Sequence, residues 1–219
     1  MGFIVALLSM LLMSALGAAL VLTTTSETLI ASNFRESLDG QYAADAALQR
    51  ATDDLAVIAD WNSVLGGLTQ STFVDGPPSG VRTLADGFNL DLDRSRNLLN
   101  CRKPASCTQS DLNAVTSERP WGANNPNWRL FAYGRLSSWL PASDSPQYVV
   151  VLVADDPAEN DDDPMQDGID ATNPGAGTIQ LRAEAFGPRG VHQVIGTTLT
   201  RIGTPRAVRV LSWRLLSHP

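Results

Sequence analysis

The first part of the chain is apolar on every side. No charged side chain occurs before Glu27, and the segment from Phe3 to Leu22 is an unbroken run of apolar and small residues. A helix rises about 1.5 Å per residue, so this segment spans the roughly 30 Å hydrocarbon core of a bilayer. The pattern predicts a membrane-spanning helix over residues 3–22.

Beyond this segment the apolar residues keep to one face. Residues 23–61 hold no proline, and Gly40 is the only glycine among them. Apolar positions alternate at spacings of four and three, which is typical of one stripe of an amphipathic helix. The helix is therefore expected to continue unbroken to about residue 59, with residues 23–61 forming its half outside the membrane. The stripe consists of Ala44, Leu48, Ala51, Leu55 and Ile58.

The second half of the chain has the pattern of strands. Runs rich in Val, Ile, Leu and aromatic residues begin at Trp128, and GPRG between Phe186 and Val191 indicates a tight turn between two of them. We predict a four- or five-stranded antiparallel sheet over residues 128–219, covered by the helix stripe, which is an α+β fold. Residues 62–127 are interpreted as an irregular connecting region. The strand candidates are WRLFAYGRL, QYVVVLVAD, TIQLRAEAFG, VHQVIGTTLTRI and AVRVLSWRLL.

Charge and histidine content narrow the function classes. The net charge is −7, and Lys103 is the single lysine. Phosphate binding draws on clustered Lys and Arg, so nucleic acid is not expected as a partner. The only histidines, His192 and His218, lie in no catalytic or metal motif. We therefore expect a protein that is not an enzyme, with His192 as a structural residue on a strand.

The two cysteines of the chain lie close together in the run CRKPASC. In a domain outside the cytoplasm, an isolated pair at this spacing favours a disulfide that closes a small loop. Two thiolates do not complete a zinc site, and neither histidine is near in sequence. The prediction is a Cys101–Cys107 disulfide, with free thiols and a metal site as the alternatives.

Acidic residues crowd into the stretch ADDPAENDDDPMQDGID between two predicted strands. Three interpretations stay open: a solvated loop, compensation by arginines that follow it in the same chain or in a neighbouring copy, or a calcium site. Calcium takes about six to eight oxygen ligands, but the EF-hand spacing is absent here. Calcium is the one cofactor that the sequence suggests, with Asp155, Asp161, Asp163 and Asp167 as the candidate ligands.

Several features of the N-terminal region occur together in one known family. Gly2 and Phe3 precede the apolar helix, Asn33 and Arg35 follow it, and the run from Tyr42 to Ala46 reads YAADA. The region resembles type IV pilins, and in particular the N-terminal region of PilX-like minor pilins. The strand, GPRG, strand pattern is also similar to the C-terminal part of PilX-like proteins.

This resemblance implies a processing site and a location. Prepilin peptidase would cleave after Gly2, leaving residues 1–2 as a residual leader and Phe3 as a methylated N-terminus. The chain would sit in the inner membrane with a periplasmic head and then enter a pilus at the cell surface. Its partners would be other pilin subunits, contacted through the N-terminal helix.

Two departures from the family pattern qualify the expected role. Major pilins carry Glu as the fifth mature residue, whereas Leu7 stands at that place here. The difference indicates a minor or initiating subunit more than a bulk filament subunit. Only Met1 stands before Gly2, so the basic leader expected for the family is missing from the printed sequence.

Three other interpretations stay open. A type II secretion pseudopilin uses the same kind of helix and processing. A membrane-tethered adhesin or binding domain that never polymerises would share the anchor and the head. A cleaved secretory signal, cut near Gly17, would remove the apolar segment altogether.

Overall fold

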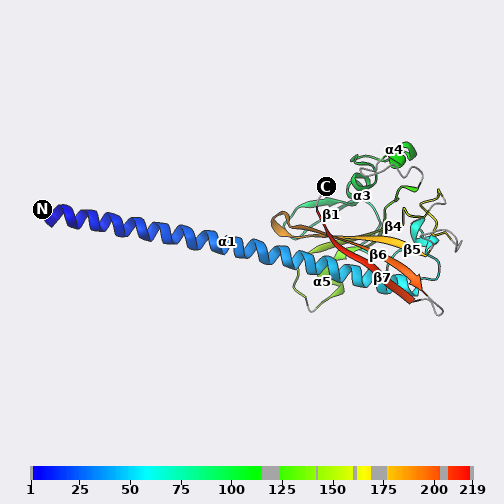
Figure 1. The fold of residues 1–219 in the computed structure, drawn as a ribbon, viewed down its shortest axis with the longest axis horizontal. Helices are drawn as coiled ribbons and strands as arrows, with labels where there is room; N and C mark the ends of the chain where they lie inside the picture. The colour runs from blue at the N-terminus through cyan, green and yellow to red at the C-terminus, as the bar shows by residue number, and fades with distance from the viewer. Residues whose placement is uncertain are drawn as a thin grey trace. The chain divides into compact units, whose positions relative to one another are not determined.

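The computed structural model describes residues 2–114, 124–141, 143–159, 162–168, 177–202 and 207–217. The chain divides into two compact units, Met1–Leu38 and Asp39–Pro219, and each is described by itself. Helix α1 (Gly2–Val57) is continuous across the boundary between them (Figure 1). The predicted unbroken helix is confirmed, and it ends two residues before the expected position.

The second unit, called the head below, is built on one antiparallel sheet of five strands (Figure 1). The strands pair in chain order, so each lies beside the one that precedes it. Together with α1, this sheet confirms the predicted α+β fold. The predicted hairpin is also present: the GPRG turn forms the short 3-10 helix η2 (Pro188–Gly190), and Phe186 pairs with His192 across it. The strands are β3 (Arg129–Arg135), β4 (Tyr148–Asp155), β5 (Thr178–Phe186), β6 (His192–Ile202) and β7 (Ala207–Leu216).

The stripe of α1 packs on one face of this sheet. Ala44, Leu48, Ala51 and Leu55 are buried there, and Ile58 is partly buried against the same core. Alanine and glycine on the helix permit a close approach: a Cβ atom at Gly40 would lie 3.0 Å from Cγ1 of Val191. The sheet contributes the following residues to this core: Val149, Val151, Val153, Ile179, Leu181, Ala183, Ala185, Ile195 and Leu199.

The end of α1 is held by an arginine from the sheet. Arg201 donates hydrogen bonds to the carbonyl oxygens of Ile58 (2.6 Å) and Ala59 (2.9 Å), just beyond the helix. Its guanidinium lies 3.9 Å from the ring centroid of Trp61, and Trp61 Nε1 donates to the carbonyl oxygen of Leu55. A cation at this end of a helix satisfies backbone acceptors that have no partner within the helix.

The opposite face of β3 and β4 is covered by the region between α1 and the sheet. Figure 1 shows α3 and α1 on opposite sides of the strands. Leu90, Leu92 and Tyr148 belong to this second core. The region interpreted as irregular thus contains short elements: α2 (Asn62–Leu65), β1 (Val81–Thr83), β2 (Asn89–Asp91), α3 (Leu92–Cys101) and α4 (Gln109–Ala114). Helix α5 (Leu136–Trp139) follows β3.

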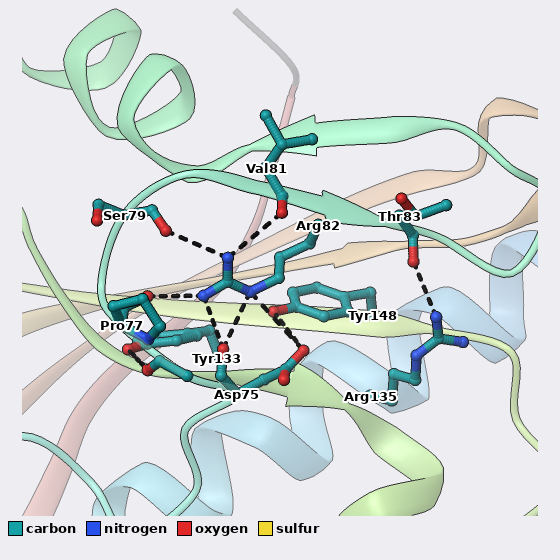
Figure 2. A network of polar contacts seen from close by, with 10 residues as sticks. Asp75, Pro77, Ser79, Val81, Arg82, Thr83, Tyr133, Arg135 and Tyr148 are labelled. Atoms are coloured by element: carbon teal, nitrogen blue, oxygen red, sulfur yellow. Dashed lines mark hydrogen bonds and ion pairs between the residues drawn. The ribbon is translucent and has the colours of Figure 1, made fainter.

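One arginine holds the loop before β1 against the sheet (Figure 2). Arg82 donates hydrogen bonds to the carbonyl oxygens of Asp75 (2.7 Å), Pro77 (2.6 Å) and Ser79 (3.2 Å). Tyr133 of β3 donates its hydroxyl to the carbonyl oxygen of Gly76 at 2.8 Å. Burial raises the pKa of the Tyr133 hydroxyl, which keeps this donor protonated.

Candidate functional site

The most prominent candidate site is the first unit, residues 2–38 of α1. Among the described residues, α1 is the one helix long and apolar enough to cross a membrane, and none of its most apolar window is buried. Its large apolar side chains lie open, with Phe3 76% and Leu11 71% exposed. Apolar surface of this extent is typical of a segment that meets lipid or another apolar helix.

Six hydroxyl groups of this unit donate hydrogen bonds to backbone carbonyl oxygens one turn earlier in the helix. Thr24 Oγ1 donates to the carbonyl oxygen of Leu20 at 2.9 Å, and Thr25 Oγ1 donates to that of Val21 at 2.8 Å. Unsatisfied polar groups are costly in hydrocarbon, so such bonds let hydroxyl side chains lie at the edge of a membrane span. The side chains that bond in this way are Ser9, Thr23, Thr24, Thr25, Ser26 and Thr28.

The predicted processing residues lie at the start of this helix. Gly2 begins α1 and is exposed. Phe3 and Leu7 are also exposed. Cleavage after Gly2 and methylation of Phe3 stay predictions, because the geometry of a folded helix does not test them.

The second candidate is a group of carboxylates at the far end of β4. Oxygen atoms of Asp155, Glu159 and Asp167 all lie within 4.8 Å of one another. Asp155 and Glu159 are buried, with 5% and 1% of their surfaces exposed. Asp167 is fixed by two hydrogen bonds: its backbone N–H donates to Asn62 Oδ1 at 2.7 Å, and its side-chain Oδ1 accepts from the N–H of Gly177 at 2.6 Å.

The predicted calcium ligands are therefore only partly brought together. Asp155 and Asp167 belong to the group, whereas Asp163 lies outside it and accepts hydrogen bonds from its own loop. Asp161 lies outside the described residues. Glu159 joins the group because the chain turns just after β4 and brings its side chain back toward Asp155. The N–H of Glu159 donates to the carbonyl oxygen of Asp156 at 2.9 Å in this turn. Carboxylate oxygens suit calcium, and calcium binding stays a prediction.

Cys101 and Cys107 form the predicted disulfide, with their Cα atoms 5.9 Å apart. It closes a small loop at the end of α3, and the neighbouring Asn100 joins this end to the sheet through two hydrogen bonds with the backbone of Trp128. Within the loop, Lys103 lies 2.6 Å from Asp111, and this contact, with further hydrogen bonds from Thr108, lowers the pKa of the Asp111 carboxyl to about 2. The disulfide therefore has a structural role: it closes the loop that follows α3.

His192 lies in a cluster of polar side chains with Glu184 and Arg182. Its Nε2 lies 2.8 Å from Oε2 of Glu184, and Arg182 Nε donates to the other carboxylate oxygen at 2.6 Å. Burial alone would raise the pKa of Glu184, but His192 and Arg182 outweigh it and hold the pKa below its ordinary value. The arrangement orients His192 as a partner of a buried carboxylate, and its ring stacks on Phe186 at 4.4 Å.

An open cavity of about 260 Å³ lies beside this histidine. Its walls come from the loop between β1 and β2 and from the turn between β5 and β6, and they are mainly apolar. Phe88 is 63% exposed at its edge. A cavity of this size is below the usual range for small-molecule sites, about 300–1,000 Å³.

Comparison with known proteins identifies one part of the chain. Residues 2–49 match the family model described as PilX N-terminal. The match covers the region that carries the sequence resemblance, so the PilX-like assignment is confirmed for the N-terminal region. No curated protein and no solved structure matches the chain. The head beyond residue 49 is therefore interpreted from its own geometry.

Proposed function

We propose that this protein is a minor pilin, a structural subunit that is anchored in the inner membrane and assembles into or primes a type IV pilus. One observation carries the proposal: the segment that matches PilX N-terminal, residues 2–49, contains the run of exposed apolar side chains in the first part of α1. PilX-like pilins are structural subunits, which agrees with the absence of a catalytic motif from the sequence.

In this proposal α1 has two uses. Residues 3–22 hold the subunit in the inner membrane before assembly, with the head in the periplasm. In the filament the same residues pack against the helices of neighbouring pilins. Small side chains allow helices to approach closely in an apolar environment. The small residues of this segment include Ala6, Gly17, Ala18 and Ala19.

Processing by prepilin peptidase completes the proposal. Cleavage after Gly2 would expose the amino group of Phe3, which would then be methylated. Leu7 offers no carboxylate to a neighbouring amino terminus at the place where major pilins carry Glu. That difference supports a minor or initiating position over a repeated position in the filament shaft.

The test is the mass of the N-terminal peptide after expression with a type IV pilus system. We expect a peptide that begins at methylated Phe3, and we expect the protein in sheared pili at low abundance. Gly2→Val should abolish cleavage and leave the protein in the membrane. A wild-type peptide that still begins at Met1, or that is cut near Gly17, would contradict the proposal.

Fractionation separates the remaining alternatives. A type II secretion pseudopilin would also begin at Phe3, but it would support secretion and be missing from sheared pili. A tethered adhesin that does not polymerise would keep Met1 and stay in the membrane.

A further inference from the structure

We propose that the open cavity beside His192 binds a cationic side chain, a lysine or an arginine carried by a partner protein. The cavity lies between the loop that joins β1 to β2 and the turn that joins β5 to β6, and its lining residues all belong to the described part of the chain. The inference concerns the head beyond residue 49. It does not rest on the proposed function, so either can fail without the other.

The cavity has the size of one long side chain. Its volume is about 260 Å³, whereas sites for drug-sized ligands usually measure about 300–1,000 Å³. One side of it is backbone, because Gly187 and Gly190 are among the lining residues. Gly190 has a φ of 77°, a conformation that favours glycine, so this side of the cavity stays free of side chains.

The walls suit the aliphatic part of a long side chain. Leu84 is buried at the base of the wall that precedes β2, and Phe88 of the same loop is 63% exposed. On the other side the ring of Phe186 stacks on that of His192, with 4.4 Å between their centroids. Lysine and arginine pack their methylene groups on apolar surface of this kind. The face of an aromatic ring also attracts the cation itself.

A single carboxylate gives the cavity its charge. Asp86 is the one acidic residue of the lining, and neither Lys nor Arg is present there. Its Oδ1 accepts a hydrogen bond from the N–H of Phe88 at 3.1 Å, which holds the carboxylate in the loop. Within the described part of the chain, Oδ2 of Asp86 makes no hydrogen bond or ion pair. This oxygen can accept hydrogen bonds from an ammonium or guanidinium group.

Basic residues close by in the chain leave the Asp86 carboxylate available. Arg189 belongs to η2 but not to the lining of the cavity. Arg135 donates to the carbonyl oxygen of Thr83 at 2.8 Å. His192 directs its Nε2 at Glu184, which lies outside the lining. An entering cation therefore meets one acidic group and no basic side chain in the lining.

Size, walls and charge together select the ligand. The Asp86 carboxylate repels an anion, and one carboxylate is too few ligands for a metal ion such as calcium, which takes about six to eight oxygen atoms. A neutral apolar side chain would match the walls but would leave the carboxylate unused. A lysine or arginine side chain matches both, since it joins an aliphatic stem to a group that donates hydrogen bonds.

Ligand-detected saturation-transfer NMR on the full-length chain in dodecyl maltoside micelles tests this site. The probe is the N-acetyl methylamide of arginine, and the norleucine derivative offers a neutral side chain of similar length. We expect the arginine derivative to bind about threefold to tenfold more tightly than the norleucine derivative, and added salt to reduce the difference. Equal affinities, or no binding of the arginine derivative, would overturn the proposal.

Two variants assign the binding to this cavity. Asp86→Asn removes the charge but keeps the oxygen that accepts from Phe88, so it should weaken binding of the arginine derivative alone, by about threefold to tenfold. Phe88→Ala should weaken binding of both derivatives. The matched controls are Asp144→Asn and Leu68→Ala, which change exposed residues outside the lining and should have no effect. Binding that survives Asp86→Asn unchanged would place the cation elsewhere and overturn the proposal.

A last probe separates a side chain on a polypeptide from a free cation. n-Butylguanidinium carries the same charged group without the backbone atoms. It should bind no more tightly than the arginine derivative, because the open cavity leaves room for a backbone at its mouth. If n-butylguanidinium bound while the arginine derivative did not, the site would be closed to a polypeptide, and the assignment to a partner protein would be wrong.

Discussion

At the scale of single residues, Arg82 shows how one side chain organises a loop. Only 14% of its side chain is exposed, and its nitrogen atoms reach backbone carbonyl oxygens on the two sides of Gly76 and beyond (Figure 2). The loop wraps around the guanidinium group, which thus replaces the secondary structure that the segment lacks. Loss of this side chain would leave the carbonyl oxygens of Asp75, Pro77 and Ser79 without the donors that Arg82 supplies.

We predict that Arg82→Met lowers the free energy of unfolding by about 2–4 kcal/mol, because several charge-assisted hydrogen bonds are lost together. Arg82→Lys should be intermediate, since an ammonium group offers fewer donors in a different geometry. Chemical denaturation of the full chain in detergent measures the change. Arg94→Met removes an exposed arginine and should stay within about 0.5 kcal/mol of wild type; an equal effect of both substitutions would refute a special role for Arg82.

Neither Arg82 nor Glu159 could be identified from the sequence, and the reason is the same for both. The partners of Arg82 are backbone carbonyl groups, which leave no side-chain pattern to recognise. Glu159 meets Asp167 only after a turn and a contact between Asp167 and Asn62, which are 105 residues apart. Contacts set by loop geometry leave little trace in residue spacing.

At the scale of elements, long periodic segments could be predicted and short ones could not. The spacing of Ala44, Leu48 and Ala51 predicts a helix with one buried face, and no knowledge of the neighbouring elements is needed. Strands β3 to β7 are each seven or more residues long, enough to show a strand pattern. Strands β1 and β2 hold three residues each, too few to show alternation. Helix α3 depends on its Asp91 N-cap and its contacts with the sheet.

The segment after β4 carries the calcium prediction. Three carboxylates within 4.8 Å repel one another, and a bound cation would relieve that repulsion. Calcium at about 100 times its dissociation constant should stabilise the folded state by about 2.7 kcal/mol. Thermal melting with and without millimolar calcium measures the shift.

Variants make the calcium result specific to this group. Asp155→Asn should abolish the calcium response, since it removes a charged ligand at a buried position. Asp144→Asn is the matched control, because Asp144 is exposed and lies outside the group. A response that survives Asp155→Asn, or no response in the wild type, would leave electrostatic compensation as the account of the acidic segment.

At the scale of the whole molecule, the boundary between the two units falls inside a continuous helix. Residues 39–57 belong to the head, where Leu48 and Leu55 fill its core, whereas the residues before them bury little. The helix is therefore one element of secondary structure with two separate physical tasks.

Two deletions test this division. Removal of residues 1–38 should leave a soluble head with a cooperative melting transition. Removal of residues 1–59 should unfold it, because the loss of two buried leucines alone costs about 4–10 kcal/mol. Circular dichroism and melting curves report both results. If the two truncated proteins melted at the same temperature, the stripe of α1 would contribute nothing to the head.

The order of the sheet has a consequence for how the head folds. Each strand from β4 to β7 pairs with the strand that precedes it in the chain, and residues 39–57, which cover one face, come before all of them. As a chain is made from its N-terminus, every new strand meets a neighbour that is already present, so no strand waits for a distant partner. Pairings between close segments close short loops and speed folding. A head with this topology can form strand by strand as the chain is made, and the pairing of β7, the last strand, completes the sheet.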